Sequence, residues 1–444
     1  MTAREAARAI FEAALAAGDA EPLIGRALRV DGPKLVAGPR AVDLGRLRRL
    51  LVLGCGKASG AMARAVEGVL GDRIADGFVI VKDGHTAPTR RIRLAQAGHP
   101  VPDGRGQVAA ARLLELARTA GAGDLVMFLI SGGGSALTPA PAPPVTLEEK
   151  QAVTRLLLAA GATINELNAV RKHLSLLKGG QLARAAAPAM VLTLILSDVI
   201  GDPLDVIASG PTAPDPTTFA DALGVLTRRG VRDRAPVSVL ARLEAGARGE
   251  VEETPKPGDP LFERVTNLVI GNNALTVDAA AAEARRLGFD PHVLTRALEG
   301  EAREVARDLL ARARRLRPPA CLIAGGETTV TVRGRGRGGR CQEFALTAAQ
   351  ELRPHESLVA LAAGTDGTDG PTDAAGALVD AGTVARGQAA GHDPRESLKD
   401  NDAYAFLRAS GDLVITGPTN TNLLDLYIIL QPGCPRDERS APSG

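Results

Sequence analysis

The sequence predicts an α/β protein with a mainly parallel sheet in a first domain and a mixed sheet in a smaller second domain. Short apolar runs that end in glycine or polar residues alternate with stretches of helical period, which is the pattern of strand–helix–strand units. The stretch at 246–260 is rich in Pro, Gly and acidic residues and lacks an apolar period, so we expect a linker there. We place the two domains at residues 1–250 and 251–444.

The first domain is predicted to contain five strands separated by helices. Apolar runs indicate strands at 50–53, 77–81, 91–96, 124–130 and 190–196. Stretches of helical period indicate helices near 57–70, 106–120, 146–160 and 164–177. Because helices join consecutive strands, we expect these strands to be parallel.

The second domain restarts the same alternation and then changes pattern. Strands are predicted at 266–270, 291–294 and 320–324, with helices that end near 287 and 316. Two later segments, at 328–332 and 425–430, also have the residue pattern of strands. We expect these two strands to form antiparallel pairs in a mixed sheet.

Composition excludes several classes of protein. Charges of both signs are scattered along the chain and sum to +2, and aromatic residues make up 2% with no Trp, which argues against a nucleic-acid partner. The four cysteines lie far apart without a CxxC pair, which favours a reducing compartment over disulfides or a zinc site. No apolar run approaches the roughly 18 residues of a membrane span. We therefore expect a cytoplasmic protein without a membrane partner, and the assembly stays open between a monomer and a homodimer.

The segment LLVLGCGKASGAM places glycines directly after the first strand and at the start of a helix. Glycines let the backbone approach an anion, and the free N–H groups of a helix N-terminus attract negative charge. Lys57 at the first turn opposes the helix dipole, which a bound anion would explain. We predict that Gly54, Gly56 and Ser59 contact the substrate or a nucleotide.

Two other interpretations of this segment stay open. The glycine spacing also fits a loose dinucleotide-binding pattern, with Asp83 after the next strand as the ribose ligand. A tight turn whose lysine points at water is the structural alternative. A P-loop NTPase is excluded because no G-x-x-x-x-G-K-[ST] occurs.

The run FLISGGGSAL repeats the theme of a buried strand followed by glycines. Three consecutive glycines expose successive N–H groups as an anion-binding concavity, and two serines add hydroxyl donors. A flexible linker is the alternative, but linkers rarely follow a fully apolar strand. We predict a phosphate or carboxylate site formed by Ser131, Gly132, Gly133, Gly134 and Ser135.

An amphipathic helix is predicted over 165–183, with a polar stripe at the same spacing as its apolar stripe. A polar stripe is usually a solvated face, but this one ends in a Lys-Gly-Gly sequence that also suits a ligand contact. We predict Asn168, Arg171 and Lys178 as binding residues, with Ser175 on the same stripe. His173 lies off the stripe and is expected to be structural.

Carboxylates follow several predicted strands, at the edge where open α/β sheets place their chemistry. Asp198 comes first after its strand and is predicted as a base or as a group beside a metal ion. Glu327 follows another strand. Asp366 and Asp369 lie in a glycine-rich loop and offer hard oxygen ligands that suit Mg²⁺ beside substrate phosphates.

Further polar groups lie in the loops of the second domain. An Arg/Gly loop at 333–338 is predicted to be a flexible clamp for an anion, and it ends at Arg340, which can neutralise phosphoryl oxygens. Thr365 precedes the aspartate loop, and Asn420 lies in a polar loop between the last strands. We include both in the predicted binding set.

Taken together, these segments resemble the glycerate 2-kinase family, whose C-terminal part is called the MOFRL domain. The resemblance spans nearly the whole chain, and its stretches in order are GCGKAS, SGGGSAL, LNAVRKHLSLLKGGQLA, LSDVIGDPLDVIASGPT, GGETTVTV, GGRCQE, GTDGTDGPTDAAGA and TGPTNTN. It implies a Rossmann-like first domain and a MOFRL region at about 320–435. It also implies phosphorylation of D-glycerate to 2-phosphoglycerate with ATP and Mg²⁺, in a cleft between the domains.

The same resemblance implies roles for individual residues. Lys57 and Arg340 look like the critical cationic pair, and Asp198, Glu327 and Asp366 look like the acidic site residues. Members of this family have also been labelled hydroxypyruvate reductases, so an NAD(P)H-dependent reductase stays the rival hypothesis, and a non-catalytic sensor of phosphorylated metabolites is a third. The residues favour the kinase, because hydride transfer needs neither the aspartate loop nor two separate anion sites.

Overall fold

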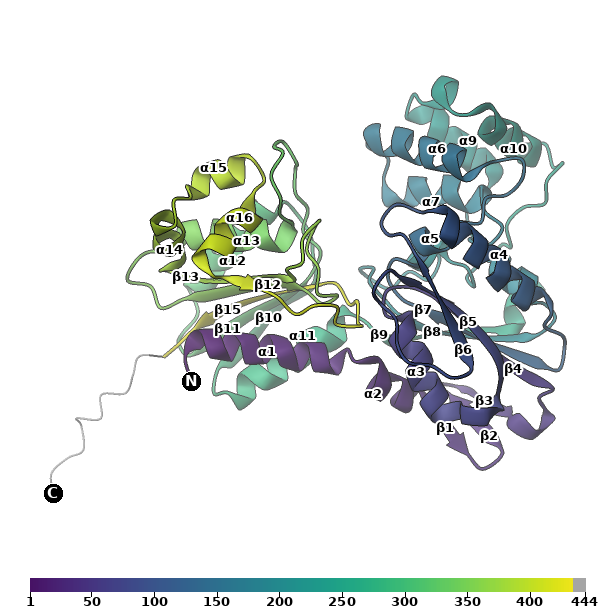
Figure 1. Ribbon diagram of the computed structural model, residues 1–444, viewed down its shortest axis with the longest axis horizontal. Helices are drawn as coiled ribbons and strands as arrows, with labels where there is room; N and C mark the ends of the chain where they lie inside the picture. Colours follow the sequence, from purple (N-terminus) through teal and green to yellow (C-terminus); the bar gives the residue numbers. More distant parts are fainter. Residues whose placement is uncertain (434–444) are drawn as a thin grey trace. The chain divides into compact units, whose positions relative to one another are not determined.

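The computed structural model describes residues 1–433, which form two compact units (Figure 1). The parallel-sheet unit comprises Asp19–Gly271. The mixed-sheet unit begins with Met1–Gly18 and resumes at Asn272. Both units are α/β in architecture, which confirms the predicted fold class, and no helix of residues 1–433 is long and apolar enough to cross a membrane.

The parallel-sheet unit is built on six parallel strands in the order β6-β5-β4-β7-β8-β9. The central strands are apolar throughout because both faces of the sheet are covered. Each of the five predicted strands is present, and β9 is the segment assigned above to the second domain. The strands are β4 (Arg49–Cys55), β5 (Ile74–Lys82), β6 (Ile92–Ala97), β7 (Asp124–Ile130), β8 (Met190–Leu196) and β9 (Val265–Gly271).

Helices of this unit both join the strands and form a separate layer. The helices are α2 (Ala20–Ala27), α3 (Ser59–Leu70), α4 (Gly104–Arg118), α5 (Gly134–Leu137), α6 (Leu147–Ala159), α7 (Ile164–His173), α8 (Gln181–Ala186), α9 (Phe219–Arg228) and α10 (Val237–Ala247). A cluster of buried apolar residues joins α6, α7, α9 and α10 into a helical subdomain (Figure 1). A small antiparallel sheet of β1 (Leu28–Asp31), β2 (Lys34–Ala37) and β3 (Arg40–Asp43) is an addition that the sequence analysis did not predict.

The mixed-sheet unit has six strands in the order β10-β11-β15-β12-β13-β14. Only β10 and β11 are parallel, and β15 pairs antiparallel with both β11 and β12, as expected for the last strand. The strands are β10 (Asp290–Leu298), β11 (Ala320–Gly326), β12 (Val359–Gly364), β13 (Gly376–Asp380), β14 (Leu413–Val414) and β15 (Asp425–Gln431).

Helices cover both faces of the mixed sheet with two separate cores. One core packs α1 (Ala3–Ala17) and α11 (Asn273–Arg286) on one face (Figure 1). The other core packs α12 (Ala302–Ala313), α13 (Arg340–Glu351) and α16 (Ala403–Ser410) on the opposite face. The remaining helices are α14 (Thr383–Ala389) and α15 (Pro394–Lys399).

The division into units differs from the predicted boundary at residue 250. Strand β9 continues the parallel sheet through its pairing with β8, so the first unit extends to Gly271. The predicted linker at 246–260 is part of that unit, because Glu253 and Thr254 bond to side chains of its helical layer. Helix α1 belongs to the other unit because its apolar face packs beside α11.

The predicted strand at 328–332 is absent. Gly326 has φ +153°, and beyond it only Thr329 makes an isolated bridge, to Glu301. The Thr328 hydroxyl lies 2.9 Å from the Tyr427 hydroxyl, so side-chain bonds replace a strand ladder here. The threonine and valine content that predicted a strand is therefore overridden by tertiary contacts.

Candidate active site

Lys57 lies just beyond β4, between two loops that hold its backbone. Its N–H donates to the Gly132 carbonyl at 2.9 Å, and its carbonyl lies 3.1 Å from His85 Nδ1. Helix α3 begins at Ser59, so Lys57 precedes the helix instead of occupying its first turn as predicted. Its side chain is half-buried. The backbone contacts fix where the ammonium stem leaves the sheet.

The glycines around Lys57 are required by close packing between neighbouring strands. A Cβ at Gly54 would lie 2.6 Å from the Leu129 carbonyl oxygen of β7. Gly56 has φ +139°, and a Cβ there would lie 2.1 Å from Ser131 Oγ. The close approach of the neighbouring segments thus explains why glycine is needed at both positions. The predicted contact of these glycines with an anion stays a prediction.

The serine-glycine loop after β7 splits into a structural half and a half that faces other polar groups. Ser131 is fully buried, and its Oγ accepts from the Ala58 N–H at 2.9 Å and lies 3.1 Å from Ser59 Oγ. Gly133 adopts a left-handed φ of +82°, which lets the chain turn into α5. Ser135 Oγ, at the far end, lies 2.9 Å from Ser209 Oγ. Ser131 and Ser59 therefore tie the two predicted anion loops to each other.

The parallel sheet brings three predicted site segments to one edge. Strands β4, β7 and β8 are adjacent and parallel, and Lys57, the loop at 131–135 and Asp198 follow their carboxyl ends. Adjacent strands are about 4.8 Å apart, so these segments lie within about 10 Å of each other across the sheet. Asp198 is half-buried. This is the edge at which open α/β sheets bind ligands.

The polar stripe predicted along one helix is broken by a turn. Helix α7 ends at His173, so Ser175 and Lys178 lie beyond it. Two members of the stripe still contact the serine-glycine loop at 131–135. Lys178 Nζ donates to the Ser135 carbonyl at 2.7 Å. Asn168 reaches the same loop through Ser209, whose Oγ donates to Asn168 Oδ1 at 3.0 Å. Tertiary contact, and not helical spacing, brings these groups together.

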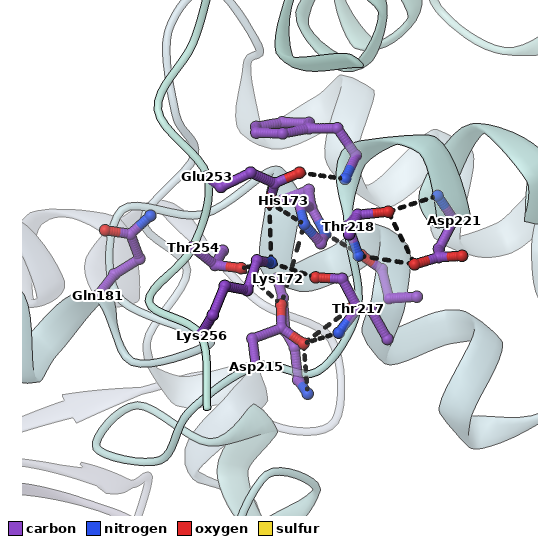
Figure 2. Close-up of polar contacts among 12 residues, drawn as sticks. Lys172, His173, Gln181, Asp215, Thr217, Thr218, Asp221, Glu253, Thr254 and Lys256 are labelled. Carbon is purple, nitrogen blue, oxygen red and sulfur yellow. Dashed lines mark hydrogen bonds and ion pairs between the residues drawn. The ribbon is translucent and has the colours of Figure 1, made fainter. Parts of the chain in front are cut away.

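A second polar network lies beside α7 and was missed by the sequence analysis (Figure 2). The fully buried Asp215 accepts from Lys172 Nζ at 3.2 Å, and Thr217 and Thr254 hydroxyls donate to the same carboxylate. His173 Nε2 lies 3.1 Å from Glu253 Oε2, which agrees with its predicted structural role. These bonds fasten the 253–256 segment to the helical layer.

Glu253 stays ionised in this network. Burial disfavours its charge, but the hydrogen bonds from His173 and the Phe219 N–H outweigh burial and lower its pKa to about 2. Lys256 adds an ion pair at 2.9 Å. Local sequence showed only a Pro-rich acidic run, so the network was detectable only from tertiary structure.

The mixed-sheet unit gathers a cation and two carboxylates at one edge of its sheet. Strand β15 runs antiparallel to β11 and β12, so its first residue, Asp425, lies opposite Gly326 and Gly364, the last residues of those strands. Arg340 contacts Asp425 at 2.5 Å and 3.0 Å and Glu327 at 2.6 Å. Asp425 was not predicted, although it opens an apolar strand with a charged residue.

Arg340 is held as a permanent cation by this arrangement. Burial disfavours its charge, but the carboxylates of Asp425 and Glu327 raise the pKa of the guanidinium above its usual range. Tyr427 Oη donates to Asp425 Oδ2 at 3.2 Å and fixes that carboxylate. A preorganised guanidinium with a planar fork suits phosphoryl or carboxylate oxygens.

The aspartate loop after β12 divides its two predicted metal ligands. Both oxygens of Asp369 accept N–H groups at the start of α13, from Cys341 at 3.2 Å and Gln342 at 2.8 Å. Burial and the Asp425 charge raise the pKa of Asp369 to about 7. Asp366 Oδ1 accepts the Thr368 N–H at 2.9 Å. Asp369 therefore caps helix α13, and both of its carboxylate oxygens are engaged in that role.

The donor chemistry of this loop fits Mg²⁺ bound together with phosphates. No group of three or more His, Cys, Asp or Glu side chains within residues 1–433 could hold a metal ion alone. Mg²⁺ at phosphate sites needs only one or two carboxylates because the nucleotide and water supply the other oxygens. Of the neighbouring predicted residues, Thr365 is buried and donates to the Leu424 carbonyl, whereas Asn420 is exposed.

The Arg/Gly loop is anchored, in contrast to the flexible clamp predicted. Backbone N–H groups of Arg333 and Gly334 donate to Asn401 Oδ1 at 2.7 Å and 2.9 Å. Those of Arg335 and Arg337 donate to the aspartates on either side of Asn401. The glycines allow this approach, and the arginine side chains remain exposed.

Comparison with known proteins shows that two parts of the chain match two protein families. Residues 6–244 match a family described as a domain of unknown function, DUF4147, and residues 320–425 match the MOFRL family. The chain is 40% identical over 438 residues to glycerate 2-kinase of Pyrococcus horikoshii, across 97% of this chain and 98% of that protein. This chain belongs to the glycerate 2-kinase family.

Two further similarities frame the functional question. A crystal structure of glycerate kinase from Thermotoga maritima has a TM-score of 0.82 at 42% identity and covers 96% of this chain and 99% of that one. A relative from Agrobacterium vitis, 43% identical over 439 residues, is named as a hydroxypyruvate reductase, and that name is itself marked as provisional. It covers 97% of this chain and 95% of that protein.

Proposed function

We propose that this protein is an ATP-dependent kinase that phosphorylates D-glycerate to 2-phosphoglycerate. The observation that carries the proposal is the set of charged groups at the strand ends of both units, in a chain that is similar along nearly its whole length to glycerate kinases. Phosphoryl transfer requires neutralisation of the γ-phosphoryl oxygens and orientation of the attacking hydroxyl. The chain offers cations and carboxylates suited to both tasks.

Each charged residue has a proposed role. Lys57 and Arg340 neutralise phosphoryl oxygens, and Glu327 positions Arg340 through their 2.6 Å ion pair. Asp198 accepts the proton of the substrate hydroxyl. The hydroxyl oxygen of the substrate forms a bond to the γ-phosphorus, and the bond between the γ-phosphorus and the β-phosphate oxygen breaks, which releases ADP. Mg²⁺, when bound with the nucleotide, supplies further charge neutralisation, with Asp366 as its proposed protein ligand and Asp369 beside it. Backbone N–H groups of the glycine loops are proposed to orient the phosphates.

The decisive experiment is ADP release from ATP by the purified protein with D-glycerate, together with identification of 2- or 3-phosphoglycerate as the product. We expect 2-phosphoglycerate. Oxidation of NADH with hydroxypyruvate, in a preparation that releases no ADP, would establish the reductase instead. Tight binding of ligand without turnover in either assay would favour the sensor.

The roles of the two cations are tested by substitution. We expect Lys57→Ala and Arg340→Ala each to lower kcat by roughly 10²-fold or more, the usual loss when one group that stabilises transition-state charge is removed. Arg155→Ala, which removes an exposed cation from α6, should leave kcat unchanged. Near-normal turnover in both site variants would contradict the mechanism.

A further inference from the structure

Three cations of the parallel-sheet unit, two buried lysines and one half-buried arginine, have no carboxylate partner within residues 1–433. We name Lys150 on α6, Arg171 on α7 and Lys178 the buried cation group. Lys150 and Lys178 are 6% and 1% exposed, and their ammonium groups donate only to carbonyls, those of Leu174 at 3.1 Å and Ser135 at 2.7 Å. In the described part of the chain, the Arg171 guanidinium forms no hydrogen bond or ion pair.

These charges repel each other. Burial, followed by the charges of Lys178 and Arg171, lowers the pKa of Lys150 well below its usual value. Burial and the Arg171 charge lower the pKa of Lys178 to about 7, against a small opposing effect of Cys55, and burial alone lowers that of Arg171. No carboxylate contributes to any of the three shifts.

The neighbouring Lys172 shows that the fold can compensate a buried lysine. Its Nζ lies 3.2 Å from Asp205 Oδ2. It also lies 3.2 Å from Oδ1 of the fully buried Asp215 (Figure 2). An uncompensated buried charge costs several kcal/mol. Helix α7 therefore presents one cation that the protein neutralises and one, Arg171, that it leaves for another partner.

We propose that the buried cation group binds the carboxylate of the substrate, which makes the protein selective for small 2-hydroxycarboxylates over neutral polyols. This inference rests on the proposed function and names the part of the substrate that this group recognises. A guanidinium fork matches a carboxylate through two parallel hydrogen bonds. The linked hydroxyl and amide groups of Ser135, Ser209 and Asn168 lie next to Lys178 and suit the hydroxyls of such an acid.

A carboxylate fits this group better than a nucleotide phosphate for two reasons. Lys150 and Lys178 are almost fully buried and Arg171 is half-buried, which favours a small ligand. Its charge is also limited, because mutual repulsion and burial reduce the protonation of the two lysines, and a single negative charge is enough to balance it. A phosphate would bring more charge and three oxygens.

The test compares substrate and nucleotide affinities in Arg171→Met and Lys178→Met with those of the wild type and of Arg155→Met, an exposed-cation control on α6. D-glycerate binding is measured by calorimetry with a non-hydrolysable ATP analogue present, and KM values by ADP release. We expect both site variants to weaken D-glycerate binding at least tenfold and to change the affinity for the ATP analogue less than twofold. Glycerol, in which the carboxylate is replaced by a neutral carbinol, should not bind to the wild type.

Thermal melting separates recognition from a structural role. Because Arg171 is uncompensated, Arg171→Met without ligand should melt no lower than the wild type. D-glycerate should raise the melting temperature of the wild type and of Arg155→Met but not that of Arg171→Met. Weakened ATP-analogue binding with normal D-glycerate affinity would show a phosphate site, and a large loss of stability with normal D-glycerate affinity would show a structural role; either overturns the inference.

The two proposals fail in different ways. A wild type that binds D-glycerate through Arg171 but releases no ADP would remove the kinase proposal and keep the carboxylate site. A wild type that releases ADP, with KM for D-glycerate unchanged in both variants, would remove the carboxylate site alone.

Discussion

Lys172 and Lys178 lie on the same short segment and are both almost fully buried, yet the charged groups around Lys172 are negative and those around Lys178 are not. Lys172 faces two aspartates. The groups that face Lys178 are the cations Arg171 of α7 and Lys150 of α6, the Cys55 thiol of β4 and the Ser135 carbonyl. The burial that raises the pKa of Cys55 to about 11 keeps that thiol neutral. Lys178 is therefore a buried cation with no compensating charge.

This difference predicts a pH dependence of stability. The folded pKa of Lys178, about 7, is lower than the unfolded value near 10.4, so between these values the unfolded chain binds more protons than the folded one. Stability without ligand should therefore rise with pH across this window, by at most about 1.4 kcal/mol per pH unit. Lys178→Met should reduce this rise, as measured by urea unfolding at pH 7 and pH 9, and the buried Lys150, whose pKa is also lowered, should keep the remainder.

A matched substitution gives the opposite sign. Lys172→Met leaves the buried Asp215 carboxylate without its cation, which typically costs about 3–5 kcal/mol. It should lower stability at both pH values. Equal effects of the two substitutions at every pH would contradict the electrostatic distinction between them.

At the scale of elements, the β4–α3 connection depends on the approach of two loops. Gly56→Ala would place a Cβ 2.1 Å from Ser131 Oγ at a φ of +139°, so Ser131 must move and lose its bond to the Ala58 N–H. Overpacking of this kind costs about 1–3 kcal/mol. We expect lower thermal stability and reduced turnover, because Lys57 is displaced with the loop.

Gly68 is the control within the following helix. It is exposed in α3, and a Cβ there meets nothing within 4 Å. Gly68→Ala should stabilise the protein by about 0.5–1 kcal/mol and leave turnover unchanged. If Gly56→Ala behaves like Gly68→Ala in calorimetric melting, the packing explanation for Gly56 is wrong.

At the scale of the whole molecule, the two units differ in how the chain builds them. The parallel-sheet unit is one continuous segment, whereas the mixed-sheet unit needs α1 from the start of the chain. Helix α1 buries Ala6, Ala7, Ile10, Phe11 and Ala14 against that unit. Burying Ile10 and Phe11 alone stabilises by about 3–6 kcal/mol, a large part of the stability of a typical domain.

This topology predicts unequal behaviour of fragments. A fragment of residues 19–271 should fold by itself and melt cooperatively in circular dichroism. A fragment of residues 272–444 should be unstable alone and should gain stability when a peptide of residues 1–18 is added. A peptide with Ile10 and Phe11 changed to Ser is the control and should have no effect. Cooperative melting of 272–444 without the peptide would contradict the role assigned to α1.

The sequence predicted individual strands well and individual contacts poorly. The continuous apolar runs of β7 and β8 were assigned with correct bounds, because a strand buried on both faces needs such a run whatever its partners are. The segment at 328–332 has strand-like residues but bonds to Tyr427 and Glu301 instead. The polar stripe predicted along one helix is likewise broken, because α7 ends at His173 and Lys178 lies beyond it. Asn168 and Lys178 are brought to neighbouring groups by tertiary contacts instead.

The sequence by itself determined the α/β class, the family and the positions of Lys57, Asp198, Glu327 and Asp366 after strands. These properties follow from local periodicity and from short motifs, which need no knowledge of distant residues. Only the tertiary structure decided that Asp425 and Glu327 form ion pairs with Arg340 and that Asp369 caps α13. It also decided that Arg171 has no carboxylate partner in the described part of the chain. The physical reason is that burial and charge compensation depend on which strands and helices become neighbours, and antiparallel β15 brings Asp425 beside strand ends about 60 and 100 residues earlier in the chain.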